Sequence, residues 1–281
     1  MKRTTGLKDW AEVLLTKKQF KEAEAKIRAA LELLEELDSD ALFTLGLILS
    51  EQGRDEESIE AYEKSIALNS EDAELCYNLG IKLGARGYAA KELELYGRAT
   101  KIDPTFGGAW INWGTSLAES GDLDGAEVKF KNALIYCPSL AVKALMNLSL
   151  VNQARANQYA VGGDLTAAKK NAEEASNQLD YAKTLIDKMT EQERQDEDMI
   201  SNVMQFKALR LQCHKLMGQV LAGSGDFEAC EGEFRTATEN FQDSVGAWEM
   251  LYRVLVRLGK TDEAVKIKEK IDVLRALGVA Y

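Results

Sequence analysis

Apolar and small residues recur along the chain at a spacing close to 34 residues. Large apolar side chains stand at equivalent points of successive segments, at Ile27, Tyr62, Tyr96, Phe130 and Phe234. A period of this length predicts pairs of helices, each with an apolar stripe that only a neighbouring pair can cover. The chain is therefore expected to stack its helix pairs around one continuous core.

Two sets of glycines follow the same period and predict different backbone requirements. The first set lets two helices approach closely because it has no side chain, and it comprises Gly46, Gly80, Gly114 and Gly218. The second set falls where a first helix ends in a left-handed residue, at Gly53, Gly87, Gly121, Gly163, Gly225 and Gly259. The two prolines, Pro104 and Pro138, also lie 34 residues apart. So few prolines in a chain that is 46% hydrophobic favour a nearly all-helical protein.

One segment carries the pattern most completely: Trp110, Trp113-Gly114 and Leu117, then Ala126, Phe130 and Pro138. This segment resembles the tetratricopeptide repeat family. The resemblance implies an all-α, right-handed superhelical α-solenoid of about seven helix pairs, forming a single domain over residues 1–281. We expect regular repeats over about 4–140, an elongated irregular repeat over about 141–210, and C-terminal repeats over about 211–278.

The period breaks between Asn147 and Gly163, where the chain has extra helical turns. The pattern from Leu165 to Met189 is helical without interruption, and Thr190 and Glu193 have the spacing of a capping box. A second helix is expected to run from there to about Ala222, which gives an elongated helical hairpin near 165–222. Two interpretations stay open: a docking or dimerisation arm, and a spacer that changes the curvature of the solenoid.

The resemblance implies a concave groove lined by the first helix of each repeat. The predicted groove residues are three amides, Asn78, Asn112 and Asn147, and an apolar band of Phe43, Leu47, Tyr77, Ile81, Ile111, Met146 and Leu150. The amides either contact a ligand or hydrogen-bond between repeats. The apolar band either forms an exposed docking surface or is covered by the next repeat.

The last repeats place Lys215, Gln219, Arg253 and Arg257 at groove positions. This basic end either receives an acidic peptide or forms an ion-paired surface. Trp10, Trp110, Trp248 and His214 align with positions where the family packs its helices, so we expect them in the core. Binding of chaperone C-terminal tails is not expected, because Lys143 alone cannot form the cationic clamp that this use requires.

Charge and residue chemistry exclude several functions. The 35 basic and 46 acidic residues give a net charge of −11, which disfavours nucleic acids and anionic membranes as partners. No apolar stretch is long enough for membrane insertion, and the start has no signal core, so the sequence is either a mature or an excised form. Four cysteines without a Cys-x-x-Cys pair suggest reduced thiols and an intracellular, cytoplasmic location. A single histidine and the lack of a phosphate-binding loop predict no metal, no cofactor and no enzymatic activity.

These features predict a protein–protein interaction scaffold. In the first hypothesis it is a non-catalytic adaptor that binds a peptide or amphipathic helix of a partner protein in the concave groove. In the alternative it is a structural or assembly-factor subunit of a larger complex, which docks through the long helical hairpin and the convex face. Self-association is a third possibility.

Overall fold

The structure is a computed structural model that describes residues 2–34 and 38–277. The described residues are helical apart from short connections, and none of them forms a strand, which confirms the all-α solenoid class. The chain divides into two compact units at the bond between Ser120 and Gly121. Residues 35–37, within the predicted regular repeats, and residue 278, at the end of the predicted C-terminal repeats, lie outside the described residues.

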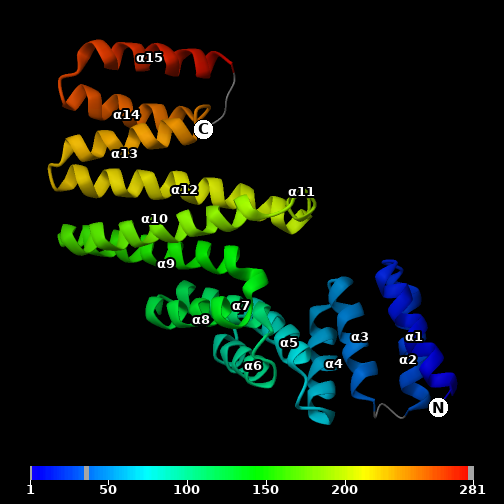
Figure 1. Cartoon of the computed structure of the whole chain (residues 1–281). Coiled ribbons are helices and arrows are strands. Elements are labelled where there is room, and N and C mark those ends of the chain that lie inside the picture. Colours follow the sequence, from blue (N-terminus) through cyan, green and yellow to red (C-terminus); the bar gives the residue numbers. More distant parts are fainter. Residues whose placement is uncertain (1, 35–37, 278–281) are drawn as a thin grey trace. The chain divides into compact units, whose positions relative to one another are not determined.

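The first unit contains seven helices among its described residues, and consecutive helices form hairpins (Figure 1). They are α1 (Lys2–Thr16), α2 (Phe20–Leu33), α3 (Ser39–Glu51), α4 (Asp55–Leu68), α5 (Ala73–Ala85), α6 (Ala89–Ile102) and α7 (Gly107–Glu119). Each hairpin packs on the next through the contacts of α2 with α3, α4 with α5 and α6 with α7. The unit is thus a stack of helix pairs, as the period predicts.

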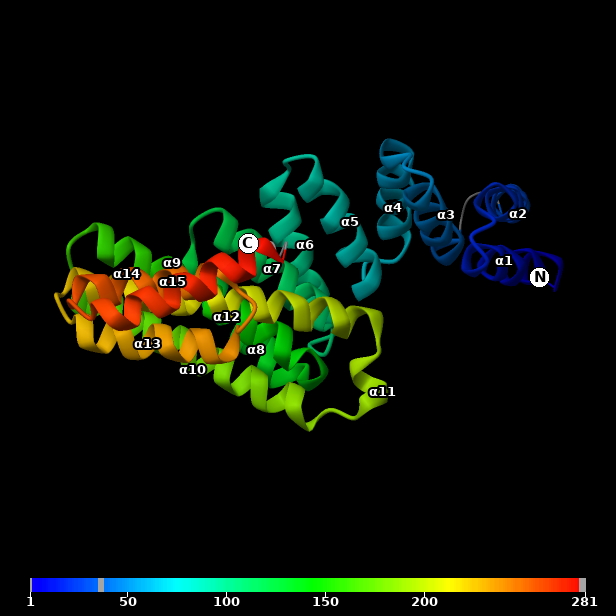
Figure 2. The ribbon, with the colours of Figure 1, turned by 90° about the horizontal axis from the view of Figure 1, so that it is seen from above.

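The second unit is built in the same way but contains much longer helices. Its elements are α8 (Leu123–Tyr136), η1 (Pro138–Leu140), α9 (Ala141–Val161), α10 (Leu165–Lys188), α11 (Glu191–Arg194), α12 (Glu197–Gly223), α13 (Phe227–Asn240), α14 (Val245–Arg257) and α15 (Thr261–Ala276). Helix α10 packs along α9 and also contacts α12. The short α11 lies where the chain turns from α10 into α12 (Figure 1, Figure 2).

The close helix contacts form at the predicted glycines. A methyl group on Gly46 would lie 2.4 Å from Cε1 of Tyr62, and one on Gly218 would lie 2.1 Å from Cζ of Phe234. All six glycines of the second set have positive φ angles, between 71° and 89°. The prediction for the first set is confirmed at Gly46, Gly80 and Gly218, where a ring packs against the glycine, and that for the second set is confirmed at all six positions, where the helix ends.

The turn after α10 differs from the predicted continuous helix. Thr190 and Glu193 do form the capping box, but they cap only the four residues of α11. Asp196 then starts a new helix, since its carboxylate accepts a hydrogen bond from the Met199 backbone N–H. This second cap explains why α12 begins at Glu197 and why the chain bends at 195–196.

The expected core aromatic residues divide into two groups. Trp110 is buried and Trp248 half-buried, and each donates its indole N–H to a backbone carbonyl. Trp10 is exposed, so its assignment to the core was wrong. Its ring lies at the surface under the Lys26 ammonium group, 4.4 Å from the ring centroid, where a cation–π contact replaces burial.

Candidate functional site

The first helices of the first unit present a row of partly accessible apolar side chains. Phe43 and Leu47 on α3 and Tyr77 and Ile81 on α5 are all half-buried. Phe43, Leu47 and Tyr77 pack against the core between α4 and α6, whereas Ile81 is not among the residues of that core. The predicted apolar row is therefore neither fully covered nor fully exposed.

Tyr77 is held by α6, by α7 and by the residue that caps the start of α7. Its ring centroid lies 5.0 Å from that of Phe106 and 6.0 Å from that of Tyr96. Its hydroxyl accepts a hydrogen bond of 3.2 Å from the Asn112 amide, and burial raises the pKa of Tyr77. Asn112 thus forms a hydrogen bond between repeats. Of the two roles considered for the predicted asparagines, ligand contact and hydrogen bonding between repeats, this is the second.

The other two predicted asparagines differ from Asn112. Asn78 on α5 and Asn147 on α9 are half-buried. Among residues 2–34 and 38–277, neither side chain has a hydrogen-bond partner within the chain. Both amides therefore keep a donor and an acceptor for a ligand.

Two predicted groove residues, Ile111 and Met146, belong to packed interiors instead, and a third, Leu150, stays partly accessible. Ile111 is 3% exposed and Met146 is 1% exposed, so their assignment to an accessible band needs correction. Neighbouring parts of the fold cover these two side chains, and Met146 belongs to the core that α9 forms with α10 and α12. Leu150 is half-buried and packs against the core formed by α9, α10 and α12.

A hollow of about 440 Å³ lies between α12 and α14, two first helices of the second unit. It is lined by Ala208, Leu211, Gln212, Lys215, Gly246, Glu249, Met250 and Arg253. Lys215 and Arg253, which the sequence places at groove positions, thus line one depression. Gln219 and Arg257 do not line it, and the Arg257 guanidinium lies 5.3 Å from the ring centroid of Phe227.

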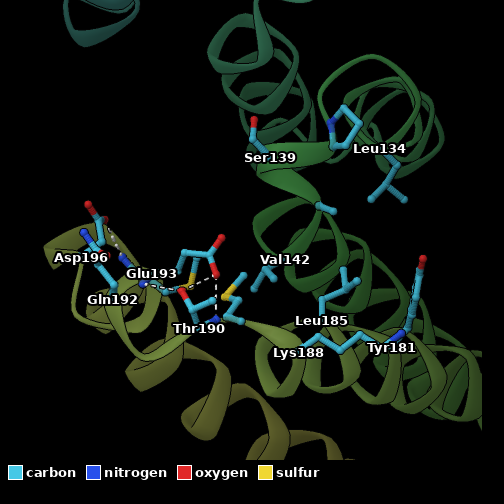
Figure 3. Close-up of a pocket in the computed structure, with 14 residues that line it drawn as sticks. Leu134, Ser139, Val142, Tyr181, Leu185, Lys188, Thr190, Gln192, Glu193 and Asp196 are labelled. Carbon is cyan, nitrogen blue, oxygen red and sulfur yellow. Dashed lines mark hydrogen bonds between the residues drawn. The ribbon is translucent and has the colours of Figure 1, made fainter.

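A larger cavity of about 970 Å³ opens in the second unit around the bend before α12 (Figure 3). Leu134 of α8, Val142 of α9, Leu185 of α10 and Met199 of α12 supply apolar walls. Figure 3 shows Tyr181, Leu185 and Lys188 along one side and Thr190, Gln192 and Glu193 along the other.

Sequence reasoning missed this cavity, and only the second cap at Asp196 signals the bend that creates it. Glu193 stays ionised at its rim, since the Thr190 backbone N–H and hydroxyl donate to it at 2.7 and 2.8 Å and lower its pKa.

The residues with reactive side chains are enclosed in the core. All four cysteines are buried as reduced thiols, and burial raises the pKa of Cys213 to about 12 and that of Cys230 to about 11. His214 is buried, with Nδ1 2.6 Å from Oε1 of Glu233. The described part of the chain contains no group of three or more His, Cys, Asp or Glu side chains able to hold a metal ion. Within that part, every helix is too short or too polar to cross a membrane.

Comparisons with known structures agree on the fold. The crystal structure of MamA protein shares 20% identity with a TM-score of 0.54, over 67% of this chain and 97% of that one. YrrB, described as a tetratricopeptide repeat protein with an unusual peptide-binding site, shares 23% identity with a TM-score of 0.50, over 61% and 84%. A tetratricopeptide repeat protein from Parabacteroides merdae shares 13% identity with a TM-score of 0.55, over 98% and 94%. At these identities the likeness shows the fold.

The sequence comparisons are narrower. No curated protein matches the chain. A family model described as TPR repeat matches residues 46–84, which run from the first glycine of α3 to the end of α5. This match places a tetratricopeptide-type repeat at residues 46–84, and the 34-residue period, the glycine contacts and the stacked helix pairs give the chain the fold of tetratricopeptide repeat proteins.

Proposed function

We propose that this chain is a non-catalytic adaptor, which binds a peptide or an amphipathic helix of a partner protein on the first-helix faces of its repeats. The observation that carries the proposal is the set of half-buried, partly accessible side chains of Phe43, Leu47, Tyr77 and Ile81 on α3 and α5. Accessible apolar side chains that form a row on a protein surface are typical of interaction sites. A peptide-binding site described for YrrB, which has the same fold, supports this use of the scaffold.

Asn78 adds a polar contact to this surface. It lies on α5 between Tyr77 and Ile81 in the chain, and its amide is not used by any other residue that the structure describes. An amide can accept from one backbone N–H and donate to one backbone carbonyl of a bound segment. Apolar side chains of the partner would then supply most of the free energy of binding, and Asn78 would set its register.

In the second unit, Asn147 on α9 has an equally unused amide, and Leu150 lies less than one turn further along the same helix. We assign this pair the same role. A location inside the cell is part of the proposal, because the four free thiols suit a reducing compartment.

Substitution of Ile81 tests the proposal. The chain would be used to capture proteins from an extract of its native source, and the captured partner would be measured by quantitative mass spectrometry. Ile81→Glu is expected to reduce recovery of that partner at least about tenfold, because a carboxylate would be desolvated on binding. Asn78→Ala should weaken recovery less, by about fivefold, since it removes one or two hydrogen bonds.

Val128→Glu is the matched control for Ile81→Glu. It introduces the same charge at an exposed apolar residue of α8, a second helix, and recovery should not change. Equal recovery with Ile81→Glu and the unmodified chain, with the same circular dichroism spectrum, would contradict the proposal.

The cavity in Figure 3 favours a second candidate function, that of an assembly subunit which docks through the elongated hairpin. Its size is at the upper end of the range of about 300–1,000 Å³ for ligand pockets. The exposed ring of Tyr181 lies at its wall. If Tyr181→Glu abolishes capture and Ile81→Glu does not, the second candidate replaces the first.

A further inference from the structure

The hollow between α12 and α14 combines apolar walls with exposed positive charge. Leu211 on α12 and Met250 on α14 are half-buried and line it, whereas Lys215 and Arg253 are exposed. Lys215 follows Leu211 by one helical turn, and Arg253 follows Met250 by three residues. Residues at these spacings share a helix face, so each helix presents one apolar and one cationic side chain to the same depression.

Two small residues help to keep the depression open. Ala208 and Gly246 are part of its lining, one on each helix. A methyl group added to Gly246 would approach only the Ser244 hydroxyl, at 3.8 Å. The space beside Gly246 is therefore not filled by the chain itself.

The cations of this hollow differ from other basic residues of the chain. Arg155, Arg210 and Arg235 bind carboxylates at 2.7 Å or less. Lys215 has no carboxylate partner anywhere in 2–34 or 38–277. Arg253 reaches the Glu249 carboxylate only at 3.9 Å and has 78% of its side chain exposed.

The one carboxylate in the lining is already neutralised. Arg275 of α15 donates to Glu249 Oε1 at 2.6 Å. The lining therefore keeps an excess of positive charge, on a chain whose net charge is −11. A local field of opposite sign attracts acidic ligands to this hollow and no basic ones.

We propose that this hollow binds an acidic amphipathic helix of a partner protein. Apolar side chains of that helix would enter between Leu211 and Met250, and carboxylates beside them would pair with Lys215 and Arg253. The hollow's volume of about 440 Å³ accepts a few large side chains and no folded domain. The inference rests on the proposed function, the binding of a partner's peptide or helix, and names the chemistry of the partner.

Designed peptides test the charge and the apolar contacts separately. The probe is a fluorescein-labelled helical peptide of about sixteen residues, with leucines on one face and glutamates beside them. The first comparison peptide replaces each glutamate with lysine, the second replaces each leucine with serine, and a labelled single-stranded DNA of about sixteen nucleotides serves as a plain polyanion. Binding is measured by fluorescence anisotropy at about 25 mM and about 300 mM NaCl.

The acidic leucine peptide is expected to bind at least about tenfold more tightly than the other three probes, and more weakly at the higher salt concentration. Lys215→Glu with Arg253→Glu should weaken it by at least about tenfold and strengthen binding of the lysine peptide. Lys169→Glu with Lys170→Glu is the matched control, since it makes the same charge change at exposed residues of α10, outside the hollow. This control should leave every affinity unchanged.

Three results would overturn the inference. They are equal binding of the acidic and lysine peptides, equal binding of the DNA, and unchanged binding after the two substitutions in a chain with an unaltered circular dichroism spectrum. The capture experiment with Ile81→Glu addresses a different unit and a natural partner. A failure of the peptide experiment alone therefore removes the inference and leaves the proposed function standing.

Discussion

The two units expose different chemistry on the same kind of helix. In the first unit, α3 and α5 present Phe43, Leu47 and Ile81, and Tyr77 is tied to Asn112 across repeats. In the second unit, α12 and α14 present Lys215 and Arg253 beside a hollow. The contacts between paired helices are nevertheless alike in both units, since a glycine packs against an aromatic ring in each: Gly46 against Tyr62, and Gly218 against Phe234. Positions that hold repeats together are thus constrained by packing, whereas positions that face outward are free to set what the chain binds.

Charged contacts between successive repeats also recur. Glu24 of α2 binds Arg28 four residues on and Arg54 at the start of α4. In the second unit, Glu231 of α13 likewise binds Arg235 four residues on, and Lys260 at the start of α15. A carboxylate on a second helix therefore links its own helix to the next repeat in both units.

Adding a methyl group at the glycine contacts tests whether the two units share one packing arrangement. Gly46→Ala and Gly218→Ala should each lower the free energy of unfolding by about 3 kcal/mol, because the Tyr62 and Phe234 rings must move. Urea denaturation followed by circular dichroism measures the loss, and hydrogen exchange shows which unit is affected.

Gly232→Ala is the control for these glycine substitutions. Gly232 lies within α13, and a methyl group there would meet nothing within 4 Å. Alanine should stabilise the helix by up to about 1 kcal/mol. A loss confined to only one of Gly46→Ala and Gly218→Ala would break the likeness between the two interiors.

The second prediction concerns pH and the carboxylate links. Hydrogen bonds from Lys260 and Arg235 lower the pKa of Glu231, which is 6% exposed. Burial opposes ionisation of Glu24, but hydrogen bonds from Arg28, Gln52 and Arg54 outweigh it and lower that pKa as well. A carboxyl group whose pKa is lowered by folding stabilises the folded state. This contribution is complete at pH values above the ordinary pKa of 4.5, and it is lost as the pH falls through the pKa of the folded state.

Glu231→Gln should therefore lower the free energy of unfolding by about 2 kcal/mol at pH 7, and the difference from the unmodified chain should shrink in acid. Glu24→Gln should behave in the same way. Urea denaturation at about pH 7, 5 and 3.5 measures both effects, with the exposed Glu239→Gln as a control within about 0.5 kcal/mol. If the loss of unfolding free energy in Glu231→Gln were the same at every pH, the ion pairs of Glu231 would not be the cause of that loss.

The features that repeat every 34 residues, such as the glycines at helix ends and at helix contacts, could be predicted from the sequence. Gly53 and Gly225 need positive φ angles wherever a first helix ends, and the spacing alone locates them. Gly46 and Tyr62 could be paired because both repeat with the period. The capping box of Thr190 and Glu193 is a local contact and was equally accessible.

Predictions from the sequence failed where helix packing decides whether a side chain is buried. They stayed open where only a bound partner can show the role of a residue. Ile111 and Met146 are expected beside their accessible neighbours, but packing within the fold buries them, which the repeat position alone does not reveal. The hollow with Lys215 and Arg253 depends on how two helices are spaced, which no residue pattern records. The site residues Asn78, Asn147 and Ile81 stay predictions, since only a bound partner can test them.

The smallest expected change in unfolding free energy distinguishes a residue that supports the fold, Tyr77 on α5, from a residue reserved for binding, Lys215 on α12. Tyr77→Phe removes the acceptor of the Asn112 amide, so the first unit should lose about 1 kcal/mol of unfolding free energy. Lys215→Gln should change stability by less than about 0.5 kcal/mol, because the exposed ammonium group has no carboxylate partner among the residues described. Urea denaturation of both variants measures the contrast. If Lys215→Gln cost as much as Tyr77→Phe, the cation would serve the fold, and the face of α12 could not be regarded as reserved for a partner.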